Sequence, residues 1–136
     1  MKIGFACGIF DLFHAGHALM LKECKQYCDY LIVALNKGEN ISETINPGKQ
    51  KPLYSPEDRK LIMESCRYVD EVLIYDSEEE LLKILKNKKI NIRFLGDDYK
   101  EKKITGSGLN IPIHYIDRSH GLSASLFRKN IIERKK

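Results

Sequence analysis

The stretch Gly8-Ile9-Phe10-Asp11-Leu12-Phe13-His14-Ala15-Gly16-His17 determines how the rest of the chain is interpreted. An apolar run over residues 3–7 leads into it, and a stretch with helical apolar periodicity, residues 18–27, follows it. Together they predict a buried strand, a tight glycine turn and a helix. Gly8 and Gly16 have no Cβ, so the backbone can come close to a ligand. The first turn of a helix carries unpaired N–H groups and a partial positive charge, which favours an anionic ligand.

Two histidines lie at the start of the expected helix. His14 and His17 are three residues apart, so we expect both on one face of its first turn. Two imidazoles beside an anion-binding helix terminus are suited to holding a phosphate. An isolated H-x-x-H pattern would also fit a solvated helix start, or two zinc ligands that lack a third.

The length and composition indicate one domain spanning residues 1–136. A hydrophobic fraction of 43% allows a real core, and a charged fraction of 31% is typical of a soluble protein. The net charge of +4 suits a protein that handles phosphates. It is too small to indicate nucleic-acid binding, and no basic stripe is interleaved with aromatic residues.

The chain carries no run of 18 apolar residues, so we expect no membrane insertion. A signal peptide is not expected either, because Asp11 interrupts the N-terminal apolar run. The four cysteines do not form paired C-x-x-C motifs. We interpret them as reduced core thiols, which predicts a cytoplasmic protein. They are Cys7, Cys24, Cys28 and Cys66.

Apolar runs and helical patterns alternate along the chain. The expected strands are residues 3–7, 30–36, 71–75, 92–95 and 111–116, and the expected helices are 16–27, 56–66, 78–87 and 123–133. This alternation predicts an α/β fold: a Rossmann-like, doubly wound parallel sheet of about five strands with helices on both faces. Ligands of such sheets bind beyond the carboxyl ends of the strands, where the strand order reverses. The turn at Gly8 follows the first strand, as that rule requires.

Residues 8–17 resemble the HxGH signature of the nucleotidyltransferase superfamily in its G-x-F-D-x-x-H-x-G-H form. This form is similar to that of the cytidylyltransferases, and most of all to the glycerol-3-phosphate cytidylyltransferases. The resemblance extends nearly over the whole chain, from Gly8 to Asn130. It implies that His14 and His17 are catalytic. It also implies that the nucleotide binds at Gly8, Ile9, Phe10, Asp11 and Gly16.

A long, polar, turn-rich segment, residues 37–55, follows the second expected strand and contains Lys49-Gln50-Lys51. Without further evidence, this is a solubilising pair of lysines on a loop. The resembling family carries a K-x-K here, just before a helix, whose lysines reach the phosphates. The resemblance therefore implies that Lys51 is catalytic and that Lys49 helps to bind the acceptor. A loop that carries such lysines can close over a substrate.

The helix after this segment has a readable start, with Ser55 as N-cap and Pro56 at the first helical position. The segments E-x-R-K-L-I and R-Y-V-D-E-V follow, and both resemble those of the family. The resemblance implies a homodimer and acceptor binding by Arg59, Arg67 and Asp70, with Arg67 acting in its own or a neighbouring subunit. An arginine fork suits a phosphomonoester because it binds two oxygens at once. A surface pair between Arg67 and Asp70 is the alternative.

The fourth expected strand ends in Leu95-Gly96-Asp97-Asp98-Tyr99, which looks like the family's G-D-D-W. The resemblance implies nucleotide binding by Asp97 and acceptor binding by Asp98. A plain turn after the strand also explains these residues.

The segment Arg118-Ser119-His120-Gly121-Leu122-Ser123-Ala124-Ser125 resembles the family's R-T-x-G-I-S-T-S motif. Ser123 is a good N-cap, so a second anion-binding helix terminus is expected here. The resemblance implies that Arg118 is catalytic and contacts the nucleotide together with Gly121, Leu122, Ser123 and Ser125. The alternative is a capped terminal helix with no ligand.

The implied reaction is direct displacement at the α-phosphorus of CTP by a small phosphorylated acceptor. Catalysis would come from alignment and charge neutralisation, since no nucleophile activated by a base is evident. Mg²⁺ is expected on the triphosphate, held largely by phosphates and water. Asp11 would orient either the metal or the turn.

The acceptor is the least determined part of this hypothesis. Glycerol 3-phosphate is the acceptor of the most similar family, and the product would belong to a cell-surface polymer or capsule pathway. Phosphoethanolamine, phosphocholine, a phosphorylated amino acid or amide, and a sugar phosphate are alternatives. Gly38, Tyr99 and His120 depart from the family pattern at positions that bear on the acceptor. An adenylyltransferase and a non-catalytic nucleotide-binding module are the remaining alternatives.

Overall fold

The computed structural model describes residues 1–38, 51–96, 104–116 and 130–133. Five parallel strands form one sheet in the order β3-β2-β1-β4-β5. They are β1 (Ile3–Gly8), β2 (Tyr30–Asn36), β3 (Glu71–Tyr75), β4 (Ile92–Gly96) and β5 (Ile113–Ile116). The predicted α/β fold with a Rossmann-like parallel sheet is confirmed.

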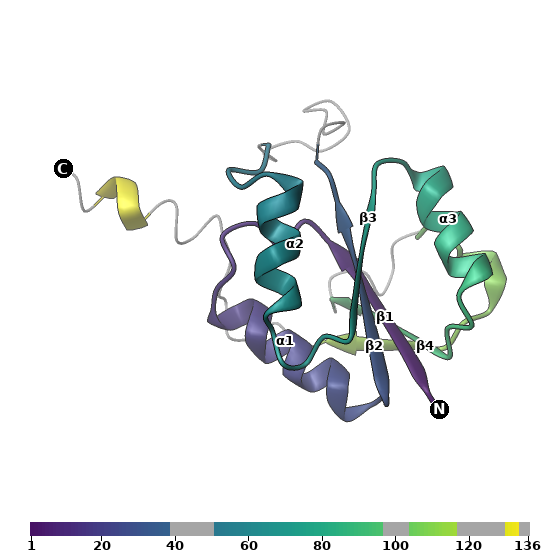
Figure 1. Cartoon of the computed structure of the whole chain (residues 1–136). Coiled ribbons are helices and arrows are strands. Elements are labelled where there is room, and N and C mark those ends of the chain that lie inside the picture. The colour runs from purple at the N-terminus through teal and green to yellow at the C-terminus, as the bar shows by residue number, and fades with distance from the viewer. Residues whose placement is uncertain (39–50, 97–103, 117–129, 134–136) are drawn as a thin grey trace.

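Helices cover both faces of the sheet (Figure 1). α1 (Ala15–Gln26) and α2 (Pro56–Glu64) lie on one face, and α3 (Glu78–Asn87) lies on the other. β2 is apolar along nearly its whole length because it is buried from both sides. Alternate residues of β1 contribute to the two cores: Ala6 to the core under α1 and α2, and Phe5 to the core under α3.

The element boundaries depart from expectation in small, explicable ways. α1 begins at Ala15, one residue early, because His14 caps it from outside. α2 ends at Glu64, two residues early, where the Ser65 hydroxyl donates to the Ile62 carbonyl. β5 begins after Pro112, which has no N–H to donate to a ladder. Of the last expected helix, only residues 130–133 are described, and they are helical.

The strand order reverses between β1 and β4. β1, β2 and β3 follow one another in one direction across the sheet, and the chain then returns to place β4 on the other side of β1. The glycine turn after β1 therefore lies at the position where open α/β sheets bind their ligands.

Candidate active site

The side chains of His14 and His17 accept hydrogen bonds from backbone N–H groups at the start of α1. His14 is the N-cap, and its Nδ1 accepts the N–H of Gly16 at 3.0 Å. The Nδ1 of His17 accepts the N–H of His14 at 3.2 Å. Because both Nδ1 atoms accept hydrogen bonds, the proton of each neutral ring is on Nε2. Each imidazole therefore has its Nε2–H as donor. The expected pairing of the histidines is confirmed, with His14 just outside the first turn.

Aromatic rings fix the orientation of His17. The His14 ring stacks on it with a centroid separation of 3.9 Å. Phe10 approaches edge-on at 5.3 Å, and Phe13 lies tilted at 5.4 Å. Three neighbouring rings thus restrict the His17 imidazole to one arrangement, which a hydrogen-bond donor in an active site requires.

The glycine turn is strained on both sides of Asp11. Phe10 has φ 52° and Leu12 has φ 50°, values that residues with a Cβ rarely adopt. A Cβ at Gly8 would come within 3.1 Å of the Phe10 ring, so any larger residue there would have to displace that ring by a few tenths of an ångström. The strained backbone points the carboxylate of Asp11 toward the approach to α2, where it accepts two backbone hydrogen bonds.

Asp11 and Arg59 are both buried, with 5% and 2% of their surface exposed. The carboxylate oxygens of Asp11 accept the N–H groups of Leu53 and Tyr54 at 2.7 and 3.0 Å. Of the two roles considered for Asp11, the structure thus places it as an orienter of the backbone. The Arg59 guanidinium donates to four backbone carbonyls, of Ile9, Asn36, Lys37 and Tyr54. These contacts show that Arg59 holds backbone groups together, and the acceptor binding that we expected of it stays a prediction.

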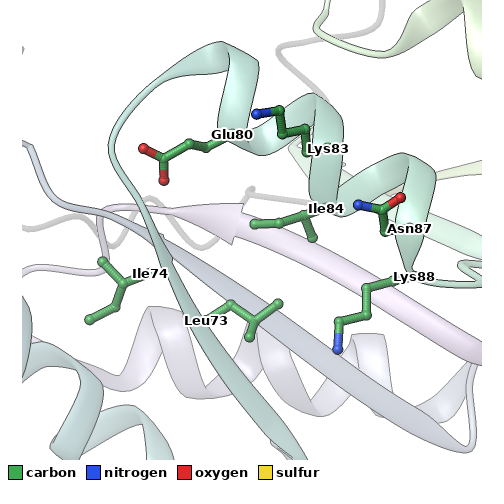
Figure 2. A pocket seen from close by; sticks show the side chains of 7 residues that line it. All are labelled: Leu73, Ile74, Glu80, Lys83, Ile84, Asn87 and Lys88. Carbon is green, nitrogen blue, oxygen red and sulfur yellow. The ribbon is translucent and has the colours of Figure 1, made fainter.

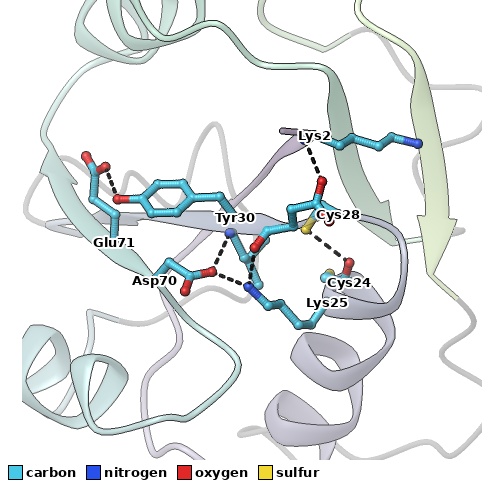
Figure 3. Close-up of polar contacts among 9 residues, drawn as sticks. Lys2, Cys24, Lys25, Cys28, Tyr30, Asp70 and Glu71 are labelled. Atoms are coloured by element: carbon cyan, nitrogen blue, oxygen red, sulfur yellow. Dashed lines mark hydrogen bonds and ion pairs between the residues drawn. The ribbon is translucent and has the colours of Figure 1, made fainter.

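Arg67 and Asp70 lie at the other end of the sheet from the histidines. Asp70 precedes β3, whose first residue, Glu71, pairs in register with Ile32 near the amino end of β2. Its carboxylate accepts the N–H of Leu31 at 2.8 Å and pairs with Lys25 (Figure 3). The strands are parallel, so this end is a strand length away from the glycine turn.

In this structure Asp70 links α1 to β2 and β3, and the acceptor contact that we expected of it stays a prediction. Arg67 is exposed and donates to the Tyr68 hydroxyl at 3.0 Å, and Asp70 pairs with Lys25, so the alternative of a surface pair between Arg67 and Asp70 is not what the structure shows. The acceptor binding expected of Arg67, in its own or a neighbouring subunit, stays a prediction.

Several predicted site residues lie outside the described part of the chain. They are Lys49, Asp97, Asp98, Arg118, Gly121, Leu122, Ser123 and Ser125. Lys51 is described and exposed, two residues before the N–H of Leu53 that Asp11 holds. The sequence reasoning missed the backbone groups of Leu53 and Tyr54, because a main-chain contact leaves no signature in residue type.

A sequence model of the family described as cytidylyltransferase-like matches residues 5–132. The chain belongs to this family. A glycerol-3-phosphate cytidylyltransferase of Bacillus subtilis is 36% identical, with 96% of this chain and 98% of that protein covered. These findings make this cytidylyltransferase-like protein a nucleotidyltransferase enzyme.

More distant relatives agree with this membership. The bifunctional protein HldE of Campylobacter curvus is 32% identical over 96% of this chain, which spans only 27% of that protein's length. A lipopolysaccharide core biosynthesis protein of Thermoplasma volcanium superimposes with a TM-score of 0.65. It is 26% identical and covers 86% of this chain and 95% of its own. The family fold is thus also that of a solved structure.

Burial raises the thiol pKa of Cys7, Cys24 and Cys28, so none of these three is an activated nucleophile. All four cysteines are free, as expected. Cys7 immediately precedes the glycine turn, and burial raises the pKa of its thiol, although the nearby Arg93 charge opposes the shift. A neutral thiol is a poor nucleophile. The geometry at this position therefore agrees with direct displacement.

A separate cavity of about 370 Å³ lies between α3 and β3, away from the histidines (Figure 2). Its walls include Leu73 and Ile84, with Lys83 and Lys88 at the rim. It lies beside the edge strand of the sheet and not at the strand-order reversal, so we do not assign it to the cytidylyltransferase reaction.

Among the described residues, no cluster of three or more His, Cys, Asp or Glu could hold a metal ion. None of the described helices is long and apolar enough to cross a bilayer.

Proposed function

We propose that the enzyme transfers CMP from CTP to a small phosphomonoester and releases pyrophosphate, with glycerol 3-phosphate as the first candidate acceptor. An oxygen of the acceptor phosphate forms a bond to the α-phosphorus, and the bond from that phosphorus to the oxygen bridging the β-phosphorus breaks. The attacking oxygen is already anionic, so no strong general base is needed.

The observation that carries this proposal is the pair of backbone hydrogen bonds that the Nδ1 atoms of His14 and His17 accept at the strand-order reversal. It places two Nε2–H donors beside an anion-binding helix terminus. Donors held in place in this way stabilise negative charge that develops on phosphate oxygens during displacement. We assign one Nε2–H to the leaving pyrophosphate and the other to the α-phosphate. The nucleotide lies against the turn from Gly8 to Asp11, with Gly16 beside it.

Positive charge comes from residues further along the chain. Lys51 reaches the phosphates from the approach to α2, and Lys49 assists it. We assign the bridging of phosphates to Arg118, and contacts with the nucleotide to Gly121, Leu122, Ser123 and Ser125. Asp97 contacts the nucleotide and Asp98 the acceptor. These assignments follow the family motif residue by residue.

Mg²⁺ fits this chain as a companion of the triphosphate. The Asp11 carboxylate is engaged by two backbone N–H groups, so we propose that phosphate oxygens and water supply most of the coordination. Bound in this way, Mg²⁺ neutralises phosphate charge.

The acceptor has a second candidate, a sugar phosphate. The solved Thermoplasma volcanium relative is described as a lipopolysaccharide core biosynthesis protein, which favours a saccharide product. The 36% identical Bacillus subtilis enzyme favours glycerol 3-phosphate instead. Either product would belong to a cell-surface polymer. We also propose a homodimer in which a neighbouring subunit brings Arg67 to the active site.

Pyrophosphate release with Mg²⁺ tests the proposal, with CTP and ATP each compared across a panel of small phosphomonoesters. We expect release with CTP and glycerol 3-phosphate. Release with CTP and an acceptor other than glycerol 3-phosphate would support the proposed reaction and identify a different acceptor. Release with ATP alone would overturn the cytidylyl assignment, and no release together with no CTP binding would overturn the proposed function.

A further inference from the structure

We infer that Asp11 and Arg59 are positioning residues that hold the backbone after Lys51 against the glycine turn and so aim Lys51 at the histidine site. The inference deepens the proposed function and rests on it, because it takes Lys51 as a catalytic residue. Neither side chain contacts the reacting atoms in this account. They act through the chain segment that carries the lysine.

Arg59 joins three separate segments at one point. Its Nη1 donates to the carbonyls of Ile9 and Asn36 at 3.0 and 2.6 Å. Its Nη2 donates to Lys37 at 2.7 Å, and its Nε donates to Tyr54 at 3.2 Å. Ile9 belongs to the glycine turn, Asn36 and Lys37 to the end of β2, and Tyr54 to the approach to α2. One buried guanidinium therefore connects the glycine turn to the end of β2 and to Tyr54, which lie on either side of Lys51 in the sequence.

Asp11 completes the attachment from the opposite side. Its two oxygens take the N–H groups of Leu53 and Tyr54, so this dipeptide is held through its N–H groups and through the Tyr54 carbonyl. Burial lowers the pKa of the Arg59 guanidinium, and the charge of Asp11 opposes that shift. The charges of the two buried groups therefore compensate each other.

Lys51 is close enough in sequence to be controlled by this attachment. Two residues of extended chain span at most about 7 Å, so the Cα of Lys51 lies within that distance of the Cα of Leu53. Pro52 lies between them, and a residue before proline is restricted to extended backbone. Holding Leu53 in place therefore also fixes the direction in which the chain passes Lys51.

A purely stabilising role is the competing explanation, and Arg93 supplies a matched control. Arg93 is also a buried arginine, 3% exposed, and its Nη1 donates to the Thr105 carbonyl at 2.6 Å. It lies in β4 under α3 and does not contact residues 51–54 in any described hydrogen bond. Arg59→Lys and Arg93→Lys both replace a buried fork by a single ammonium, but only the first removes contacts next to Lys51.

The first experiment is a double-mutant cycle on turnover in the full chain. We expect Lys51→Ala to lower kcat by about tenfold or more in the wild-type background. In the Arg59→Lys background, where Lys51 is already misplaced, the same substitution should lower kcat by less than about threefold. In the Arg93→Lys background the full loss should return. An equal loss in all three backgrounds would overturn the inference.

The second experiment needs no activity. Hydrogen exchange at the amides of Leu53 and Tyr54 should accelerate at least about tenfold in Asp11→Asn and in Arg59→Lys, but not in Arg93→Lys. Circular dichroism would verify that each variant is folded, and the milder Arg59→Lys variant decides if Asp11→Asn does not fold. Unchanged exchange in folded variants would overturn the attachment itself. If the wild-type protein releases no pyrophosphate, the proposed function is wrong, and so is the catalytic role inferred for Lys51. The exchange data would still show whether Asp11 and Arg59 hold the backbone at Leu53 and Tyr54.

Discussion

His14 and His17 stack with ring centroids 3.9 Å apart, and the Nδ1 of His17 accepts the backbone N–H of His14. The Nδ1 of His14 accepts the N–H of Gly16. The motif therefore serves two purposes with one pair of rings. The Nδ1 atoms cap the helix, and the Nε2–H groups are the donors that we assign to the proposed reaction.

These two purposes can be separated at His14. Asparagine is a good N-cap, so His14→Asn should retain the free energy of unfolding, whereas His14→Ala should lower it by about 0.5–2 kcal/mol. Both variants lose the Nε2–H donor, so both should lose about 100-fold or more in turnover. Urea denaturation and pyrophosphate release measure the two effects. Normal turnover in His14→Asn would show that this ring serves only as a cap.

His17 should be needed for turnover more than for folding. His17→Ala removes a donor to phosphate, and we expect at least about a hundredfold loss of turnover with the fold retained. Near-normal turnover in a folded variant would contradict the assignment.

Asp11 should matter for stability in a way that an exposed aspartate does not. In Asp11→Asn one carboxylate oxygen becomes an NH₂ group that faces a backbone N–H. Two donors then face each other, and neither has an acceptor at that position. We expect the free energy of unfolding to fall by about 1–3 kcal/mol. Asp58→Asn, an exposed change in the first turn of α2, is the control, with an expected loss of under about 1 kcal/mol. Equal effects of the two substitutions would argue against the contacts of Asp11 described above.

If Arg67 acts in a neighbouring subunit, two inactive variants should complement each other. Mixing Arg67→Ala with His17→Ala yields half mixed dimers, each with one site that has both an intact histidine and the partner's intact arginine. After subunit exchange, about a quarter of wild-type turnover should return, as two-fold symmetry requires. No recovery despite verified mixed dimers would contradict action between subunits.

Glu71 makes stability depend on acid pH. Burial alone would raise its pKa, but hydrogen bonds from Lys88 and Tyr30 outweigh this and lower the pKa from the ordinary 4.5. A carboxyl with a lowered pKa stabilises the fold above its unfolded pKa, and that stabilisation is lost as the pH falls through the folded pKa. We expect Glu71→Gln to lower stability by under about 1 kcal/mol at pH 7 and to weaken the decline below about pH 4.5. Denaturation curves at pH 7, 5 and 3 measure this, and parallel pH profiles would contradict it.

The order and type of the elements were readable from the sequence because hydrophobic periodicity reports burial directly. The bounds of β2, β3 and α3 match their patterns residue by residue. For α3, Ser77 accepts from the N–H of Glu80 at its start, and Leu81 and Leu85 face the core one turn apart. The motif from Gly8 to His17 likewise placed the two histidines at a helix start.

The tertiary structure decided which of the motif residues face one another. Arg59 and Asp70 both belong to motif segments, but Arg59 lies in the first half of α2 (Pro56–Glu64), and Asp70 directly precedes β3 near the opposite end of the sheet. Arg59 therefore joins the glycine turn, while Asp70 fastens Lys25 and Leu31 at the opposite end. Residue type determined the local chemistry of each side chain. The partners of Asp11 and Arg59 are backbone N–H and carbonyl groups, which every residue carries, so only the folded chain could select them.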